Sequence, residues 1–237
     1  MKKLLILLSL TLPLLANTFA GDITDKKNLC NVIGGITINT MNYSNNTDDH
    51  RGAKVGGLAG IGFEHRFKNV AAIEIDALYV NKGAQSTTDN FLAKTTNRLN
   101  FHSVELPILF KLYLGKRKIF NINVGGFASY SFYTQLTING KNKLNGDKIN
   151  EKSENITKNS NNPKDANGNY LFRPYDAGVV GGFEFISTRG FGAGLRVAQG
   201  FVDFINPKFI GANLIYQANK DKKVWHTGVG LYFTYRF

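Results

Sequence analysis

The sequence predicts an all-β protein: a closed antiparallel barrel of eight transmembrane strands in up-and-down order. Long segments alternate apolar and polar residues, and the connections between them alternate long and short. The last segment, Trp225 to Phe237, also places aromatic residues toward both of its ends. A strand directs successive side chains to opposite faces. An apolar face framed by aromatic girdles, on strands of about 9–11 residues, is typical of a transmembrane barrel.

The closing segment shows the pattern most clearly, and it is long for a strand of a soluble protein. One face carries Trp225, Thr227, Val229, Leu231, Phe233, Tyr235 and Phe237. The other carries small or polar residues from His226 to Arg236. The ending, with Gly230, Phe233, Tyr235 and Phe237, resembles the C-terminal signal read by the outer-membrane barrel assembly machinery. That machinery is therefore an expected partner during insertion.

The N-terminal residues 1–20 are predicted to be a secretory signal peptide, which leaves residues 21–237 as the barrel domain. They combine a basic start at Lys2 and Lys3, an apolar run and a small residue at Ala20. A single membrane helix is the alternative, but the apolar run is short and Pro13 interrupts it. The expected location is the bacterial outer membrane, with both termini in the periplasm.

The strands are predicted at about 31–43, 53–67, 70–81, 99–114, 119–138, 171–186, 191–204 and 225–237. Short turns are expected at 68–69, 115–118 and 187–190, and long polar loops at 44–52, 82–98, 139–170 and 205–223. In outer-membrane barrels the long loops are extracellular and the short turns periplasmic. The 139–170 loop is expected to be mobile and to bury no core. A strand extension is expected at 209–216.

The predicted lumen holds a charged, ion-paired plug. An eight-stranded barrel is just wide enough inside for side chains. The inward acids are Glu64, Glu74, Asp76, Glu105, Asp176 and Glu184, and the inward bases are Lys54, Arg66, Lys111, Arg196 and Arg236. The nearly equal numbers of inward acids and bases favour ion pairs over a wide water channel, because unpaired buried charges cost free energy. Pro107 is interpreted either as a bulge that directs Glu105 and Lys111 inward or as a tolerated irregularity.

Charge and cysteine content limit the expected partners. The net charge is +12, which falls to +10 without Lys2 and Lys3. For an exported protein this favours outer-membrane lipids, including lipopolysaccharide, over nucleic acid. Loop lysines are either contacts to the anionic leaflet or ordinary solvated charges; they are Lys82, Lys94, Lys141, Lys208, Lys220, Lys222 and Lys223. Cys30 is the only cysteine, so an internal disulfide is excluded and no metal or cofactor is expected. The expected state is a monomer.

No catalytic residues are predicted. His102 and Ser103 are adjacent, so a strand holds them on opposite faces. His226 points inward, where Ser131 or Asp176 can approach, but no triad spacing supports catalysis. Three functions remain open: a structural, adhesive or assembly and secretion-partner role; a small-solute channel; and a lipid A-modifying enzyme.

Three blocks resemble a known family: residues 104–111, residues 175–185, and residues 194–196 with 200–203. They are similar to PorT-type outer-membrane β-barrel ("porin family") proteins of the Bacteroidetes, which are Gram-negative bacteria. The resemblance covers Asn31 to Phe237. It implies an eight-stranded barrel in the outer membrane. Some members of that family assist secretion or gliding machinery, but no residue of this sequence assigns that role to this protein.

Overall fold

The computed structural model describes residues 23, 25–43, 50–68, 70–89, 93–115, 117–143, 147–157, 162–206, 208 and 223–237. The predicted signal peptide at 1–20 and the predicted strand extension at 209–216 lie outside these residues. The described part of the chain contains no helix that is long and apolar enough to cross a membrane.

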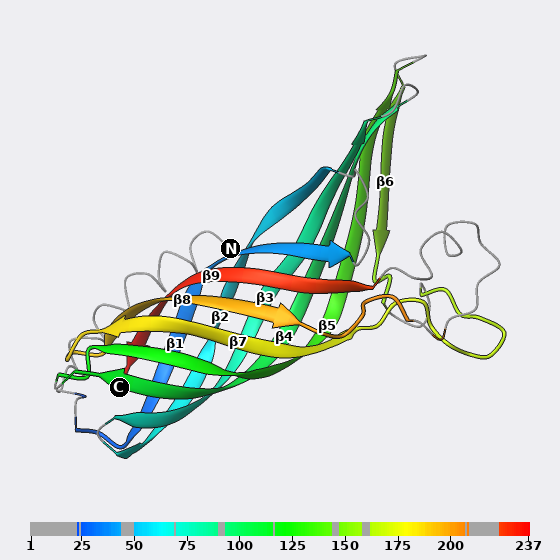
Figure 1. The fold of residues 1–237 in the computed structure, drawn as a ribbon. Coiled ribbons are helices and arrows are strands. Elements are labelled where there is room, and N and C mark those ends of the chain that lie inside the picture. Colours follow the sequence, from blue (N-terminus) through cyan, green and yellow to red (C-terminus); the bar gives the residue numbers. More distant parts are fainter. Residues whose placement is uncertain are drawn as a thin grey trace, which may run out of the picture.

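Nine antiparallel strands form one sheet within the described residues, and eight of them make a ring (Figure 1). The strands are β1 (Asn28–Tyr43), β2 (His50–Lys68), β3 (Ala71–Asp89), β4 (Ala93–Leu114), β5 (Phe120–Asn142), β6 (Lys148–Glu154), β7 (Tyr175–Ile186), β8 (Phe191–Gly200) and β9 (Val224–Arg236). Around the ring the strands follow one another in chain order, and β6 pairs with β5 beyond it. The prediction of an eight-stranded up-and-down barrel is confirmed.

The first and last strands are neighbours, which closes the ring. β1 pairs with β9 from Asn31–Arg236 to Tyr43–Val224. Beyond the end of β9, the backbones of Cys30 and Phe237 exchange two hydrogen bonds of 3.1 and 3.0 Å. Closure is required in a bilayer because lipid offers no partner to the backbone groups of an open sheet edge.

The polarity of the barrel is inverted relative to a soluble protein. Outward residues are apolar and exposed, for example Val55 at 66% and Phe233 at 62%. Inward neighbours are charged and buried, for example Glu64 at 0% and Lys111 at 1%. This arrangement is stable only where the surrounding solvent is hydrocarbon, as the alternating sequence predicts.

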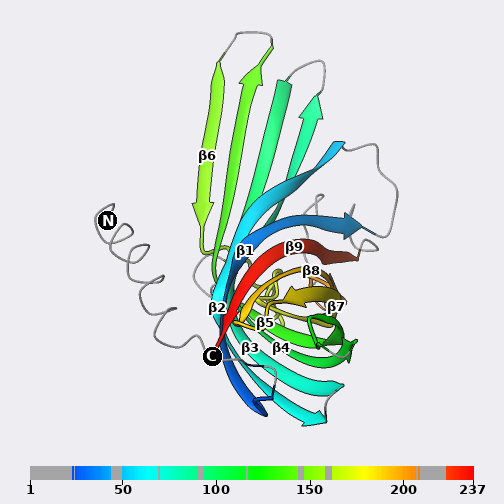
Figure 2. The same ribbon diagram turned by 90° about the vertical axis from the view of Figure 1, so that its left-hand side faces the viewer.

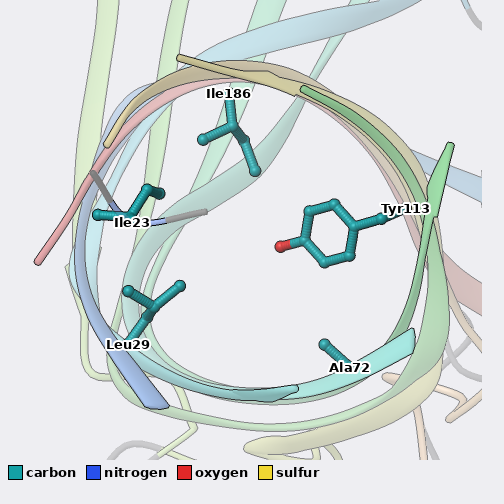
Figure 3. Close-up of a cluster of buried hydrophobic side chains, with 5 residues drawn as sticks. All are labelled: Ile23, Leu29, Ala72, Tyr113 and Ile186. Carbon is teal, nitrogen blue, oxygen red and sulfur yellow. The ribbon is translucent and has the colours of Figure 1, made fainter. Parts of the chain in front are cut away.

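The two ends of the barrel differ. The turn end carries the short β2–β3, β4–β5 and β7–β8 connections, together with Ile23 and Phe237. In the β7–β8 turn, Gly190 adopts a positive φ of 93°, a conformation that glycine tolerates best. Ile23 lies inside the ring with Leu29, Ala72, Tyr113 and Ile186 (Figure 3). The backbone N–H of Ile23 donates to Thr188 O at 3.1 Å, which holds Ile23 in this position. The five apolar side chains fill the lumen at the turn end.

The opposite end, the loop end, contains more sheet than the sequence predicts. The predicted loop at 82–98 is wrong for most of its length, because β3 and β4 continue through residues 82–89 and 93–98. The predicted 139–170 loop contains β6, which pairs with the end of β5. It also contains Ile156, Thr157 and Asn162, which are buried. We call residues 50–53, 83–89, 93–100, 135–142 and 148–154 the loop-end sheet; it rises away from the ring (Figures 1 and 2).

Pro107 does not form a bulge. The β3–β4 register is the same on both sides of it, with Ile75 opposite Ile108 and Leu78 opposite Glu105. No residue is inserted, so the bulge interpretation is wrong. The irregularity of this region lies on the other edge of β4, where the register with β5 shifts between His102 and Ser103. Glu105 and Lys111 face the lumen because they share the inward parity of β4.

Candidate functional site

Six charged side chains from five strands meet in the turn-end half of the lumen. We call them the charged cluster: Glu64, Arg66, Glu74, Lys111, Glu184 and Arg236. Their exposed fractions lie between 0% and 6%. Each occupies an inward position near the turn end of its strand, which is why the ring brings them to one level.

Two bases hold the three carboxylates together. Arg236 Nη2 lies 2.6 Å from Glu184 Oε2 and 3.3 Å from Glu74 Oε2. Lys111 Nζ contacts Glu74 and lies 3.3 Å from Glu184 Oε2 and 3.4 Å from Glu64 Oε2. Arg66 Nε donates to Glu64 Oε1 at 2.7 Å. Three acids therefore face three bases, and the cluster is formally neutral, as a buried site of charges requires.

Neutral side chains complete the hydrogen bonding of the carboxylates. Tyr113 Oη donates to Glu64 Oε1 at 2.5 Å, and Thr234 Oγ1 donates to Glu184 Oε1 at 2.7 Å. Asn31 Nδ2 donates to Glu74 Oε2 at 3.0 Å. The predicted plug omits these three residues because it contains only charged side chains. A signal was available, because Tyr113 and Thr234 lie two residues from Lys111 and Arg236 and so share their inward face.

Two further ion pairs lie nearer the loop end. Arg196 Nη2 lies 3.1 Å from Asp76 Oδ2, and its guanidinium stacks over the Tyr232 ring at 5.0 Å. Glu105 pairs with Lys82, which is only 7% exposed. The prediction that Lys82 is a loop residue, in contact with the outer leaflet or with solvent, is therefore wrong. β3 runs past the predicted strand end at Asn81 and carries Lys82 into the lumen.

Asp176 and Lys54 are the inward charges that lie outside these pairs. Asp176 lines a cavity near the loop end, and its Oδ1 has no hydrogen-bond partner within the part of the chain that the structure describes. Lys54 Nζ donates to Asn81 Oδ1 at 2.6 Å. The structure thus brings nine of the eleven predicted inward charges into ion pairs and leaves Asp176 and Lys54 apart.

Two small cavities, of about 30 and 40 Å³, lie among the described residues in the loop-end half of the lumen, and both are lined by Lys82 and His226. Such volumes hold a few water molecules. Above them, Phe204 stacks on Phe172 and meets Phe101 edge to face, each at 5.0 Å between ring centroids. These three aromatic rings cover the cavities, and backbone hydrogen bonds hold them in place, including one of 2.9 Å from Arg173 N to Phe204 O. The lumen is filled at both ends, with room for water between them.

The histidines form no catalytic arrangement among the described residues. His102 Nδ1 lies 2.6 Å from Tyr79 Oη, on a side chain that faces outward, whereas Ser103 Oγ lies 2.8 Å from Ser131 Oγ in the lumen. The His226 ring packs edge to face on Phe101 at 5.4 Å, and its Nε2 has no partner among the described atoms. Ser131 and Asp176 line the same cavity as His226, but no hydrogen bond joins them to it in the described part of the chain.

The residues of the proposed C-terminal assembly signal divide between the two faces of β9. Gly230 is buried, whereas Phe233 and Phe237 are exposed on the outer surface at 62% and 42%. Tyr235 is half-buried, and its ring lies 4.8 Å from that of Phe191 on β8. An exposed aromatic edge on the last strand suits recognition by an assembly factor, which stays a prediction.

A closed ring with an apolar exterior and a charged interior defines this chain as a small outer-membrane β-barrel protein. The family described as "Outer membrane protein beta-barrel domain" matches residues 26–206, which is most of the sequence, and the chain belongs to that family. No curated protein matches the sequence.

Solved structures are similar to this chain at low sequence identity and low TM-score. The attachment invasion locus protein Ail of Yersinia pestis is 8% identical, with a TM-score of 0.39, over 90% of this chain and 100% of its own. Neisserial surface protein A is 11% identical, with a TM-score of 0.43, over 88% and 97%. OprG of Pseudomonas aeruginosa is 14% identical, with a TM-score of 0.40, over 89% and 96%. These values are too low for any residue or role to be transferred.

Proposed function

We propose that this protein is a non-catalytic, non-conducting outer-membrane barrel that binds another macromolecule at the cell surface through its loop-end sheet. The role is adhesive, or that of a partner in assembly or secretion. One observation carries the proposal: β5 continues from Tyr130, where its pairing with β7 ends, to Asn142, and β6 pairs along this extension. These 12 residues span about 40 Å along the strand at 3.3 Å per residue.

This extension is ordered by backbone pairing rather than by a core. β3, β4, β5 and β6 pair in register through the loop-end sheet, from Asp89–Lys94 to Lys141–Lys148. Fixing each residue in one conformation costs about 1–2 kcal/mol of entropy. Crossing the bilayer needs only about 9–11 residues per strand, so the membrane does not require this sheet. A rigid polar sheet outside the barrel suits recognition of a large partner.

The orientation follows from the two ends. We infer that the turn end lies in the periplasm and the loop end outside the cell, because barrels of this kind keep short turns inside and long connections outside. Both Ile23 and Phe237 lie at the turn end, which fits a chain inserted from the periplasm. The PorT-type resemblance belongs to the same proposal and is supported by the three sequence blocks quoted above.

A small-solute channel is the alternative function, and it predicts conductance. The ion-paired charged cluster and the aromatic cover over small cavities favour a closed lumen. We therefore expect purified protein in planar bilayers to show no discrete conductance steps in 1 M KCl. A preparation with full barrel content, judged by its heat-dependent gel shift, that produces reproducible unitary steps would contradict the proposal and favour the channel.

If the protein binds a partner at the cell surface, the partner should contact the loop-end part of β5 and not its lipid-facing part. A photo-cross-linking residue at Asn139, which is exposed on the outward face of the loop-end sheet, should capture a macromolecule in living cells. The matched control is Val124 on the same strand, which is 59% exposed on the lipid-facing surface and should capture lipid alone. Identical products from the two positions, separated by gel electrophoresis and identified by mass spectrometry, would refute a partner at the sheet.

A further inference from the structure

The outward face of the loop-end sheet carries rows of cross-strand neighbours. Starting from His102 on β4, every second residue as far as Thr96 faces outward, and the register adds cross-strand neighbours on β3, β5 and β6 to each row. The middle row contains Arg98, Thr137 and Lys152. The uppermost row contains Asp89, Lys94, Lys141 and Lys148. Cations therefore recur at two levels of one flat surface.

The charges on this sheet are divided between its faces. Among the described side chains, the outward face has four exposed cations, on Arg98, Lys141, Lys148 and Lys152, against one carboxylate, on Glu154. Lys152 Nζ lies 2.5 Å from Glu154 Oε1, so these two compensate each other. The hydrogen bond from Lys152 lowers the pKa of Glu154, so the pair stays charged at neutral pH. Arg98, Lys141 and Lys148 are left as an excess of positive charge.

The uppermost row opposes the stability of the sheet. Lys141 and Lys148 are direct cross-strand neighbours in it. Like charges directly opposite one another on a sheet are destabilising. Nothing in the pairing of β5 and β6 requires two lysines opposite each other there. An anionic ligand across the row removes the repulsion.

The position of this face indicates where the ligand lies. The face continues the lipid-facing surface of the barrel upward. Tyr79, His102 and Phe132 cluster outward at its base, with Tyr79 at 6.0 Å from His102 and 6.3 Å from Phe132 between ring centroids. Such aromatic groups mark the boundary between hydrocarbon and headgroups. Arg98 lies four residues above His102, about 13 Å along the strand, and Lys141 lies eight residues above Tyr133, about 26 Å.

We infer that this face binds the phosphorylated and acidic sugars of lipopolysaccharide molecules in the leaflet around the barrel. The inference rests on the proposed function, because it assigns a ligand to the loop-end sheet. Arginine and lysine pair with phosphate and carboxylate. Interspersed hydroxyl and amide side chains, such as Thr96, Thr137 and Asn139, match sugar hydroxyls. A soluble polysaccharide has the same chemistry, but the face begins at the membrane surface, where the lipid-bound sugars are.

The test compares two triple variants with the same loss of charge. R98Q/K141Q/K148Q removes the excess cations of the face. K26Q/K27Q/R189Q removes one arginine and two lysines that are exposed at the turn end. Fluorescently labelled full-length protein in non-ionic detergent is titrated by thermophoresis in 50 mM NaCl. The probe is a lipopolysaccharide that carries two lipid A phosphates and two acidic core sugars.

The face variant is expected to bind at least tenfold more weakly than the parent, and the turn-end variant within twofold of it. Raising NaCl to 500 mM should remove most of the difference. Parent protein should bind the enzymatically dephosphorylated lipid more weakly, a measurement that needs no variant. Equal dissociation constants for the two triple variants, no effect of dephosphorylation, or equally tight binding of soluble polygalacturonate would overturn the inference. A protein cross-linked at Asn139 with no lipopolysaccharide binding would refute the inference and leave the proposed function standing.

Discussion

Replacing Arg236 with methionine is expected to lower the free energy of unfolding by about 3–5 kcal/mol, the range for removing one partner of a buried ion pair. Arg236 is 1% exposed and contacts Glu64, Glu74 and Glu184. Without it, three carboxylates share the charges of Lys111 and Arg66 alone. Urea unfolding in lipid vesicles measures the change, with the fluorescence of Trp225, the only tryptophan, as the reporter.

Two further variants separate charge balance from lost packing. R236M/E184Q leaves two acids and two bases, so it should be more stable than R236M alone. The control Arg189→Met lies in the exposed β7–β8 turn and should stay within about 0.5 kcal/mol of the parent, as surface substitutions usually do. If R236M unfolds at the same urea concentration as the parent, the charged cluster does not stabilise the barrel.

Replacing Gly125 with valine is expected to prevent most of the protein from reaching the folded barrel. Gly125 faces the lumen opposite Leu109, and a Cβ atom there would meet the backbone oxygen of Ile108 and lie 3.0 Å from Leu109 Cα. Both neighbours are backbone atoms of the adjacent strand, so they cannot move aside without breaking the ring. Overpacking of this kind costs typically 1–3 kcal/mol and at times more.

Gly126 is the matched control, because it is adjacent in sequence and faces outward. A Cβ atom at Gly126 would meet only Gly178 O within 4 Å, at an ordinary contact distance of 3.5 Å. Gly126→Val should therefore fold as well as the parent. The readout is the folded fraction after refolding into detergent, measured by the heat-dependent gel shift. Equal folded fractions for the two variants would show that lumen space does not limit this strand.

The inward charges illustrate how far sequence reasoning reaches. Alternation places Glu64, Glu74 and Arg236 on the inner face, because the two-residue period belongs to the backbone itself. It does not say which acid meets which base. Arg236 contacts Glu74 and Glu184 across strands that are far apart in the chain, and this depends on the register around the whole ring.

The loop-end sheet shows where sequence reasoning stops. Residues 82–98 and 139–154 are rich in Thr, Asn and Lys, and neither face is apolar, so periodicity gives no signal. These residues are strands because each backbone pairs with a neighbouring strand that already extends beyond the ring. Lys82 was misassigned for the same reason, since only the continued pairing of β3 directs it to Glu105.

The sequence by itself determined that an oily exterior must surround a polar interior, and that the sheet must close on itself in lipid. Those properties follow from local alternation and from the unmet hydrogen bonds of an open edge. The tertiary structure alone decided the partners of the buried charges, the filling of both ends of the lumen and the height of the polar sheet above the ring. Each of these depends on contacts between residues distant in the chain, which local patterns do not encode.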